Sequence, residues 1–183
     1  MYHVLLSSYK KISCVALLAA IQLVSAPVAF SAADELQPEQ ISNAIEQAKK
    51  WLIRQQSPNG TWKSAMRTDE TVVGATALVV LALANAGVDA DKPAMKKALT
   101  WLREQTPTDT YSVSLQTQAL AMVSPKQDLA ILERNTRWLE DRQSSGPGVT
   151  GGWSYGANRS GADNSNSQFA ILGLHEAQRA GEI

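Results

Sequence analysis

The stretch GGWSYGANRSGADNSNSQFAILGL, residues 151–174, combines a Gly-Gly-Trp turn, a polar loop and the start of an apolar helix. It follows WLEDRQ, residues 138–143, which closes an amphipathic segment. The same order occurs earlier, as WLIRQQ at 51–56, NGTW at 59–62 and an apolar run over 71–86. A plainer copy begins with WLREQ at 101–105. Self-similarity at this period indicates a helical repeat.

Six segments have apolar residues at helical spacing, and none alternates with the period of a strand. Asn43 and Glu46 fit a capping box near the start of the first helix. Outer amphipathic helices alternate with more apolar inner ones. The predicted fold is therefore all-α, with three αα-hairpins whose inner helices pack inside a ring or arc of outer helices. The expected helices cover residues 41–56, 71–86, 93–105, 111–123, 128–143 and 164–180.

The first 32 residues differ in composition from the rest of the chain. Lys10 and Lys11 precede the apolar run ISCVALLAAIQLV, residues 12–24, and small residues follow it. This pattern is typical of a secretory signal, with cleavage after Ala26 or near Ala32. The alternative, a membrane anchor, would need an apolar run of about 18 residues or more. We therefore expect a signal peptide over 1–32, a polar lead-in over 33–40, a repeat domain over 41–183, and a periplasmic or secreted protein.

Charge and cysteine content exclude several function classes. Lys plus Arg and Asp plus Glu both number 17, so nothing indicates a nucleic-acid partner. Cys14, the only cysteine, lies inside the predicted signal peptide. A mature chain without it has no disulfide, no thiolate metal ligand and no thiol nucleophile. We expect no metal and no cofactor.

The motif residues have a structural interpretation of their own. Gln55 and Gln143 follow the ends of outer helices, where they can donate hydrogen bonds to exposed carbonyls. Trp62 and Trp153 can cover the helix ends, with their indole N–H groups paired. We interpret all of them as ties within and between repeats.

A helix ending in Trp-Leu, a glutamine, a Gly-x-Trp turn and an apolar inner helix together resemble the QW-type repeat of the squalene cyclase and protein prenyltransferase superfamily. Residues 163–181, DNSNSQFAILGLHEAQRAG, are similar to uncharacterised bacterial secreted proteins with this repeat. The resemblance implies an α/α toroid, of which three hairpins form about half a ring. The motif positions are Trp51, Gln55, Gly60, Trp62, Trp101, Trp138, Gln143, Gly152 and Trp153.

Three aspartates are the candidate catalytic residues. Asp69, Asp109 and Asp163 each precede an inner helix, so repetition brings them to the same end of the arc. Carboxyl groups gathered at an apolar cavity mouth can have raised pKa values and act as acids. Each can equally be an N-cap that accepts hydrogen bonds from the helix start. The sequence leaves both interpretations open.

Active members of the resembled superfamily carry Asp-x-Asp-Asp, Asp-Asp-x-x-Asp or a zinc site with Cys and His, and the mature chain has none of these. His175 is its only histidine. The first hypothesis is therefore an exported, non-catalytic binding or interaction module. The alternatives are an isoprenoid or lipid enzyme that uses the aspartates as acids, and an inactive fragment of a longer toroid protein. Expected partners are a second copy, another toroid half or an apolar lipid.

We predict that the mature protein begins between Pro27 and Asp34, because both small-residue cleavage sites lie in or beside that range. N-terminal sequencing of protein recovered after export measures this directly. Recovery of a mature chain that still begins at Met1 would rule out a cleaved signal.

Overall fold

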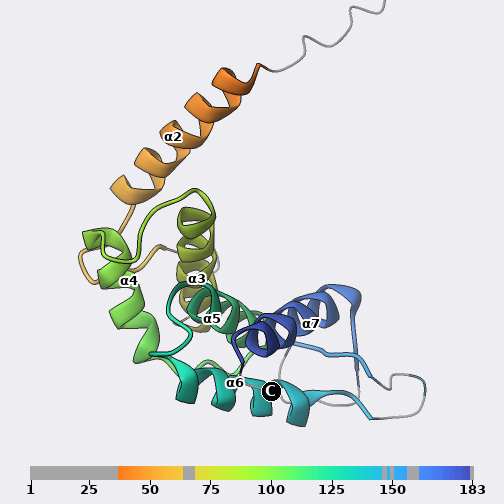
Figure 1. Ribbon diagram of the computed structural model, residues 1–183. Coiled ribbons are helices and arrows are strands. Elements are labelled where there is room, and N and C mark those ends of the chain that lie inside the picture. The colour runs from red at the N-terminus through yellow and green to blue at the C-terminus, as the bar shows by residue number, and fades with distance from the viewer. Residues whose placement is uncertain (1–36, 64–68, 146–147, 149–150, 156–160, 182–183) are drawn as a thin grey trace, which may run out of the picture. The chain divides into compact units, whose positions relative to one another are not determined.

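The computed structural model describes residues 37–63, 69–145, 148, 151–155 and 161–181 (Figure 1). These residues form helices and no strand, which confirms the all-α prediction. None of the described helices is both long and apolar enough to cross a membrane. The predicted signal peptide lies outside the described residues. The helices are α2 (Pro38–Arg54), α3 (Asp69–Asn85), α4 (Pro93–Arg103), α5 (Thr110–Val123), α6 (Leu129–Arg142) and α7 (Asn164–Arg179).

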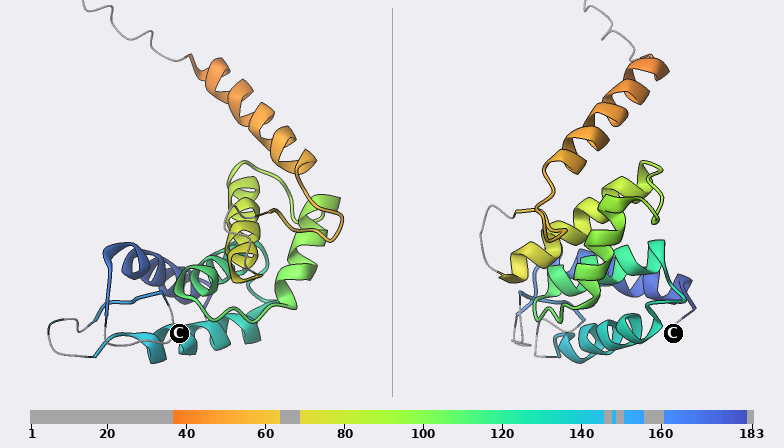
Figure 2. Two further views of the ribbon diagram at one scale, coloured as in Figure 1. Left: turned by 180° about the vertical axis from the view of Figure 1, so that it is seen from behind. Right: turned by 90° about the vertical axis from the view of Figure 1, so that its left-hand side faces the viewer.

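The chain divides into two units, Met1–Ile41 and Ser42–Ile183, and the packing described below belongs to the second. Its inner helices are α3, α5 and α7, and α5 lies between the other two (Figure 2). Of the outer helices, α4 lies against α3, and α6 lies against both α5 and α7. Inner and outer helices thus alternate as the repeat predicts. Closure of a complete ring by further hairpins stays a prediction.

The core lies around α5, whose side chains are buried on almost every side. Ala77 and Val80 of α3, Leu102 of α4 and Leu132 of α6 are fully buried around it. By contrast α3, which is just as apolar in sequence, leaves the side chain of Leu78 53% exposed. An apolar helix at the end of a layer has a neighbour on one side only, so its free side remains in contact with solvent.

The start of α2 differs from the prediction. The helix begins at Pro38, inside the expected polar lead-in, because proline fits the first helical position. The side chain of Gln40 accepts a hydrogen bond from the Gln37 backbone N–H at 2.9 Å, as the third residue of a capping box does. Asn43 and Glu46 lie within the helix, where Glu46 instead pairs with Lys49 at 2.7 Å.

Two tryptophans join the outer helices to the chain that follows them. The indole Nε1–H of Trp62 donates to the Leu52 backbone carbonyl at 2.8 Å, and that of Trp153 donates to the Leu139 carbonyl at 2.7 Å. Both side chains are almost completely buried. The last carbonyls of a helix lack the regular partners four residues on, and these bonds give them a donor, which for Leu52 is additional to the Gln55 backbone N–H at 3.0 Å. We call them the carbonyl ties.

The turns before these two tryptophans also have the same hydrogen-bond pattern. The backbone N–H of Ser57 donates to the Thr61 carbonyl, and that of Ser144 donates to the Gly152 carbonyl, both at 2.8 Å. Gly60 sits at φ +93°, and a Cβ atom on it would lie 2.6 Å from the Lys97 carbonyl oxygen. Only glycine tolerates both conditions. The first and third hairpins are therefore built alike.

The middle hairpin lacks Gly-x-Trp but has its own carbonyl tie. The Gln116 side-chain Nε2–H donates to the Leu102 carbonyl at 2.7 Å and to the Gln105 carbonyl at 3.2 Å. Leu102 follows Trp101 as Leu52 follows Trp51, so the same carbonyl is satisfied in each repeat. Gln116 is fully buried on α5, and its Oε1 accepts a hydrogen bond from Asn135 Nδ2 at 2.9 Å.

Replacement of Gln116 by alanine should lower the free energy of unfolding by about 2 kcal/mol, because it removes the side-chain donor to two carbonyls and leaves the buried Asn135 Nδ2 without its acceptor. Urea unfolding measures the change. Gln118→Ala is the matched control: Gln118 lies on the same helix, but its Nε2 only bonds back to the Ser114 carbonyl one turn earlier. The control should change stability by no more than about 0.5 kcal/mol. Equal effects of both substitutions would show that the Gln116 tie is not a main support of the fold.

Candidate functional site

Two of the three candidate acids are N-caps. The Asp109 carboxylate accepts a hydrogen bond from the Ser112 backbone N–H at 2.9 Å at the start of α5. At the start of α7, Asp163 Oδ1 accepts one from the Asn166 backbone N–H, also at 2.9 Å. This is the usual capping contact of an aspartate. Both carboxylates thus take part in the folding of an inner helix.

The surroundings of Asp163 favour its charged form. The Asn166 backbone N–H, the Ser165 hydroxyl and the Asn166 side chain all donate to its carboxylate, and they hold the pKa of Asp163 below its ordinary value. A general acid needs the opposite shift, because it must keep its proton near neutral pH. The geometry therefore favours the cap over the acid at this position.

The third candidate, Asp69, is the first residue of α3, and its side chain lies outside what the structure describes. The α3 and α5 helices run in the same direction, because Gly74 lies beside Ser112 and Asn85 contacts Met122. In the described part of the chain, no three His, Cys, Asp or Glu side chains gather closely enough to hold a metal ion. His175 is exposed on α7.

The remaining motif residues divide between ties and surface positions. Gln143 Nε2 donates to the Gly151 carbonyl at 3.1 Å, as expected for a helix-end glutamine. In the first repeat, however, Gln56 takes this role instead of Gln55, and donates to the Gly60 carbonyl at 3.0 Å. Trp51 is 55% exposed, whereas Trp138 is half-buried, with the Arg142 guanidinium 5.5 Å from its ring centre.

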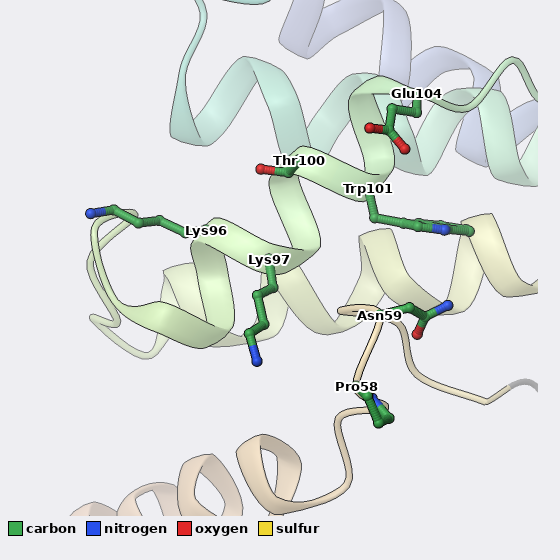
Figure 3. Close-up of a pocket in the computed structure, with 7 residues that line it drawn as sticks. All are labelled: Pro58, Asn59, Lys96, Lys97, Thr100, Trp101 and Glu104. Atoms are coloured by element: carbon green, nitrogen blue, oxygen red, sulfur yellow. The ribbon is translucent and has the colours of Figure 1, made fainter.

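A cleft lies beside Trp101, between the outer face of α4 and the turn after α2 (Figure 3). It is a shallow depression, largely open to solvent, with a volume of about 460 Å³. Figure 3 shows the Trp101 indole and the Asn59 amide extending to the same side, while Thr100 and Lys96 extend to the other. The lining residues are Pro58, Asn59, Lys96, Lys97, Thr100, Trp101 and Glu104.

The two walls of this cleft are joined by direct contacts. Gln56 Nε2 donates to the Ala94 carbonyl of α4 at 2.8 Å. The backbone of Gly60 lies directly against the Lys97 carbonyl, with no room for a side chain. Because these contacts fix the turn to the helix, the cleft is preformed, and a ligand need not order it.

The cleft combines one aromatic surface with hydrogen-bonding groups of both kinds. Asn59 Oδ1 accepts two hydrogen bonds from Thr61, one from the Thr61 backbone N–H at 3.3 Å and one from the Thr61 hydroxyl at 2.9 Å. The Asn59 amide Nδ2 therefore remains available as a donor. Lys97 supplies a further donor and a positive charge, and Glu104 supplies an acceptor and a negative charge. Neither an anion nor a cation fits this mixture as well as a neutral ligand that both donates and accepts.

A buried ion pair joins α4 to α6, and the sequence analysis missed it. The Arg103 guanidinium donates to both carboxylate oxygens of Asp128, at 2.7 and 3.0 Å, and Ser124 bonds to the same carboxylate. Asp128 is only 2% exposed. Breaking such a pair leaves a buried charge without a partner, which is strongly destabilising. We interpret this group as structural, because Arg103 and Ser124 together bond both carboxylate oxygens of Asp128.

A family model of the A-macroglobulin TED domain matches residues 18–159, well over half of the chain. No curated protein and no solved structure matches this chain. This match contradicts the resemblance to squalene cyclases and protein prenyltransferases, because TED domains are thioester-containing domains rather than terpenoid cyclases. The tie residues that suggested the resemblance explain the error, since they support hairpin packing. TED domains occur in extracellular complement and macroglobulin proteins, in agreement with an exported chain.

Replacement of Asp163 tests its role as a cap. Asp163→Ala should destabilise the protein at pH 7 more than Asp163→Asn does, because asparagine can still accept the Asn166 hydrogen bond. The folded-state pKa of Asp163 is lowered, so its stabilising contribution is complete above the unfolded value and is lost as the pH falls through the folded value. Urea unfolding from pH 7 to pH 3 should therefore show the wild type approaching Asp163→Ala. A difference that grows as the pH falls would contradict this assignment.

Proposed function

The chain belongs to the A-macroglobulin TED domain family, and we propose that it is an exported, non-catalytic module that binds its ligand without a covalent bond. The observation that carries this proposal is chemical. A thioester needs a cysteine thiol, and residues 18–159, the part that matches the family, contain no cysteine. Cys14 lies outside the match and inside the predicted signal peptide.

The candidate acids support the same proposal. One carboxylate oxygen of Asp109 and both of Asp163 accept hydrogen bonds at helix starts, and the pKa of Asp163 is lowered rather than raised. Acid catalysis at neutral pH would need a carboxyl group that holds its proton. What the described chain offers instead is a preformed cleft with an aromatic surface.

We further propose that the ligand of this cleft is a saccharide. A sugar ring has an apolar C–H face that can lie on the Trp101 indole, and hydroxyl groups that both donate and accept hydrogen bonds. The Lys97 ammonium and the Asn59 amide can donate to those hydroxyls, and the Glu104 carboxylate can accept from them. A few polar groups around an aromatic surface fix orientation in small-molecule sites. Export would bring the module into contact with glycans outside the cytoplasm.

Calorimetric titration of the exported protein with gluco-, galacto- and chito-oligosaccharides tests this function. At least one series should bind, and Trp101→Ala and Glu104→Ala should each weaken binding about tenfold or more, equivalent to about 1.4 kcal/mol. Glu104 is exposed, so its replacement should leave folding intact even if loss of the half-buried Trp101 does not.

Trp51→Ala is the comparison variant, because Trp51 occupies the equivalent position on α2 but lines a separate hollow, of about 480 Å³. It should leave saccharide binding unchanged. The proposal would be abandoned if no oligosaccharide binds. It would also be abandoned if Trp51→Ala reduces binding as much as Trp101→Ala does.

A further inference from the structure

Met122 is the exposed one of the two methionines that the structure describes. It lies near the end of α5 with 44% of its surface exposed, whereas Met95 of α4 is fully buried. A methionine thioether can be oxidised to a sulfoxide when an oxidant reaches the sulfur. Of these two side chains, only Met122 is open to an oxidant while the protein is folded.

The surroundings of Met122 come from helices on both sides of it. Because α5 lies between α3 and α7, the exposure of Met122 does not arise from a missing neighbouring helix. On one side, Asn85 of α3 contacts the Met122 sulfur. On the other, Met122 lines a small cleft of about 220 Å³ with Glu176 and Arg179 of α7. A water molecule takes about 30 Å³ in the liquid, so this cleft has room for a peroxide and for the oxygen that the sulfur would gain.

The Asn85 side chain directs an N–H group at this sulfur. Its Nδ2 donates to the Leu81 carbonyl, one turn earlier on α3, at 2.9 Å, and lies 3.5 Å from Met122 Sδ. An amide nitrogen carries two hydrogens, so one N–H group can serve each acceptor. The bond to Leu81 thereby holds the amide with a donor, rather than its oxygen, next to the sulfur.

Oxidation would strengthen this contact. A thioether sulfur is a weak hydrogen-bond acceptor, whereas a sulfoxide oxygen carries a partial negative charge and accepts far better. A sulfoxide normally disrupts the packing around a methionine, because it places a polar group among apolar ones. Beside Asn85, the new oxygen instead meets a donor that is already in place. The hydrogen bond between them would join α3 to α5 more firmly than the thioether does.

We propose that Met122 is an oxidation site whose sulfoxide is stabilised by the Asn85 amide. The oxidant is a hydroperoxide. The sulfur lone pair attacks the outer peroxide oxygen and becomes the S–O bond while the O–O bond breaks, and the proton of the attacked oxygen passes to the leaving oxygen. Sulfur is thus oxidised, and hydrogen peroxide is reduced to water. Methionine sulfoxide reductases reverse this change. The inference does not depend on the saccharide cleft.

Peptide mapping by mass spectrometry tests where the oxygen is added. The exported protein is treated with dilute hydrogen peroxide, and trypsin then separates Met66, Met95 and Met122 onto different peptides. The Met122 peptide should gain one oxygen about tenfold faster than the Met95 peptide, because the folded chain buries Met95 completely. Equal rates for these two peptides would overturn the proposal.

Thermal unfolding before and after peroxide treatment tests the role of Asn85. Oxidation should raise the melting temperature of the wild type. It should lower that of Asn85→Asp, because an ionised aspartate has the same shape but no N–H group to donate to the sulfoxide. Each oxidised protein is compared with its own untreated form, so the effect of the substitution itself cancels.

Met122→Leu is the matched control, since leucine has a similar volume and no sulfur. Peroxide should leave its melting temperature unchanged, and this shows whether the shift in the wild type arises at Met122. Three outcomes would contradict the proposal. They are a lower melting temperature of the wild type after oxidation, the same shift in the wild type and in Asn85→Asp, and a shift in Met122→Leu as large as that in the wild type.

Discussion

The backbone carbonyls at the ends of the outer helices are the constraint on which this fold depends. The Leu52, Leu102 and Leu139 carbonyls lie at helix ends, and each receives a side-chain N–H group from the next part of its repeat. The first two also accept a backbone N–H at the helix end. The donor fixes where the following inner helix must lie. The clamped turn at Gly60, and with it the wall of the Trp101 cleft, follows from the first of these ties.

The sequence predicts this plan only where the donor is local. Trp62 lies only ten residues after its acceptor, Leu52, in a Gly-x-Trp turn, so the sequence motif reveals this tie. Gln116 reaches Leu102 from inside an apolar helix, and nothing in its spacing distinguishes it from Gln118. Gln56 replaces Gln55 because α2 ends at Arg54, and the chain beyond it no longer follows helical geometry. Periodicity therefore predicts the helices well, whereas contacts between side chains and distant carbonyls require coordinates.

The functional site was harder to predict for two physical reasons. An aspartate before an inner helix has the same sequence signature whether it caps the helix or donates a proton, and only the donors around Asp163 separate these roles. The family error has a related cause. Tryptophan, glycine and glutamine at repeat positions are selected by hairpin packing, so they indicate a fold and not a reaction. Trp101 was identified as a motif residue, but its cleft depends on a turn more than 40 residues earlier in the chain.

The same repeat that builds the core also determines where the chain offers surface for binding. Among the helices that the structure describes, α5 alone has an inner helix on both sides and is covered almost completely, whereas Leu78 of α3 and Ile171 of α7 are exposed. The cleft residues lie on α4 and the turn after α2, and none of them lies on α3 or α7. Ligand binding at Trp101 therefore draws on side chains outside these apolar sides, so a substitution in the cleft can test its role without altering them.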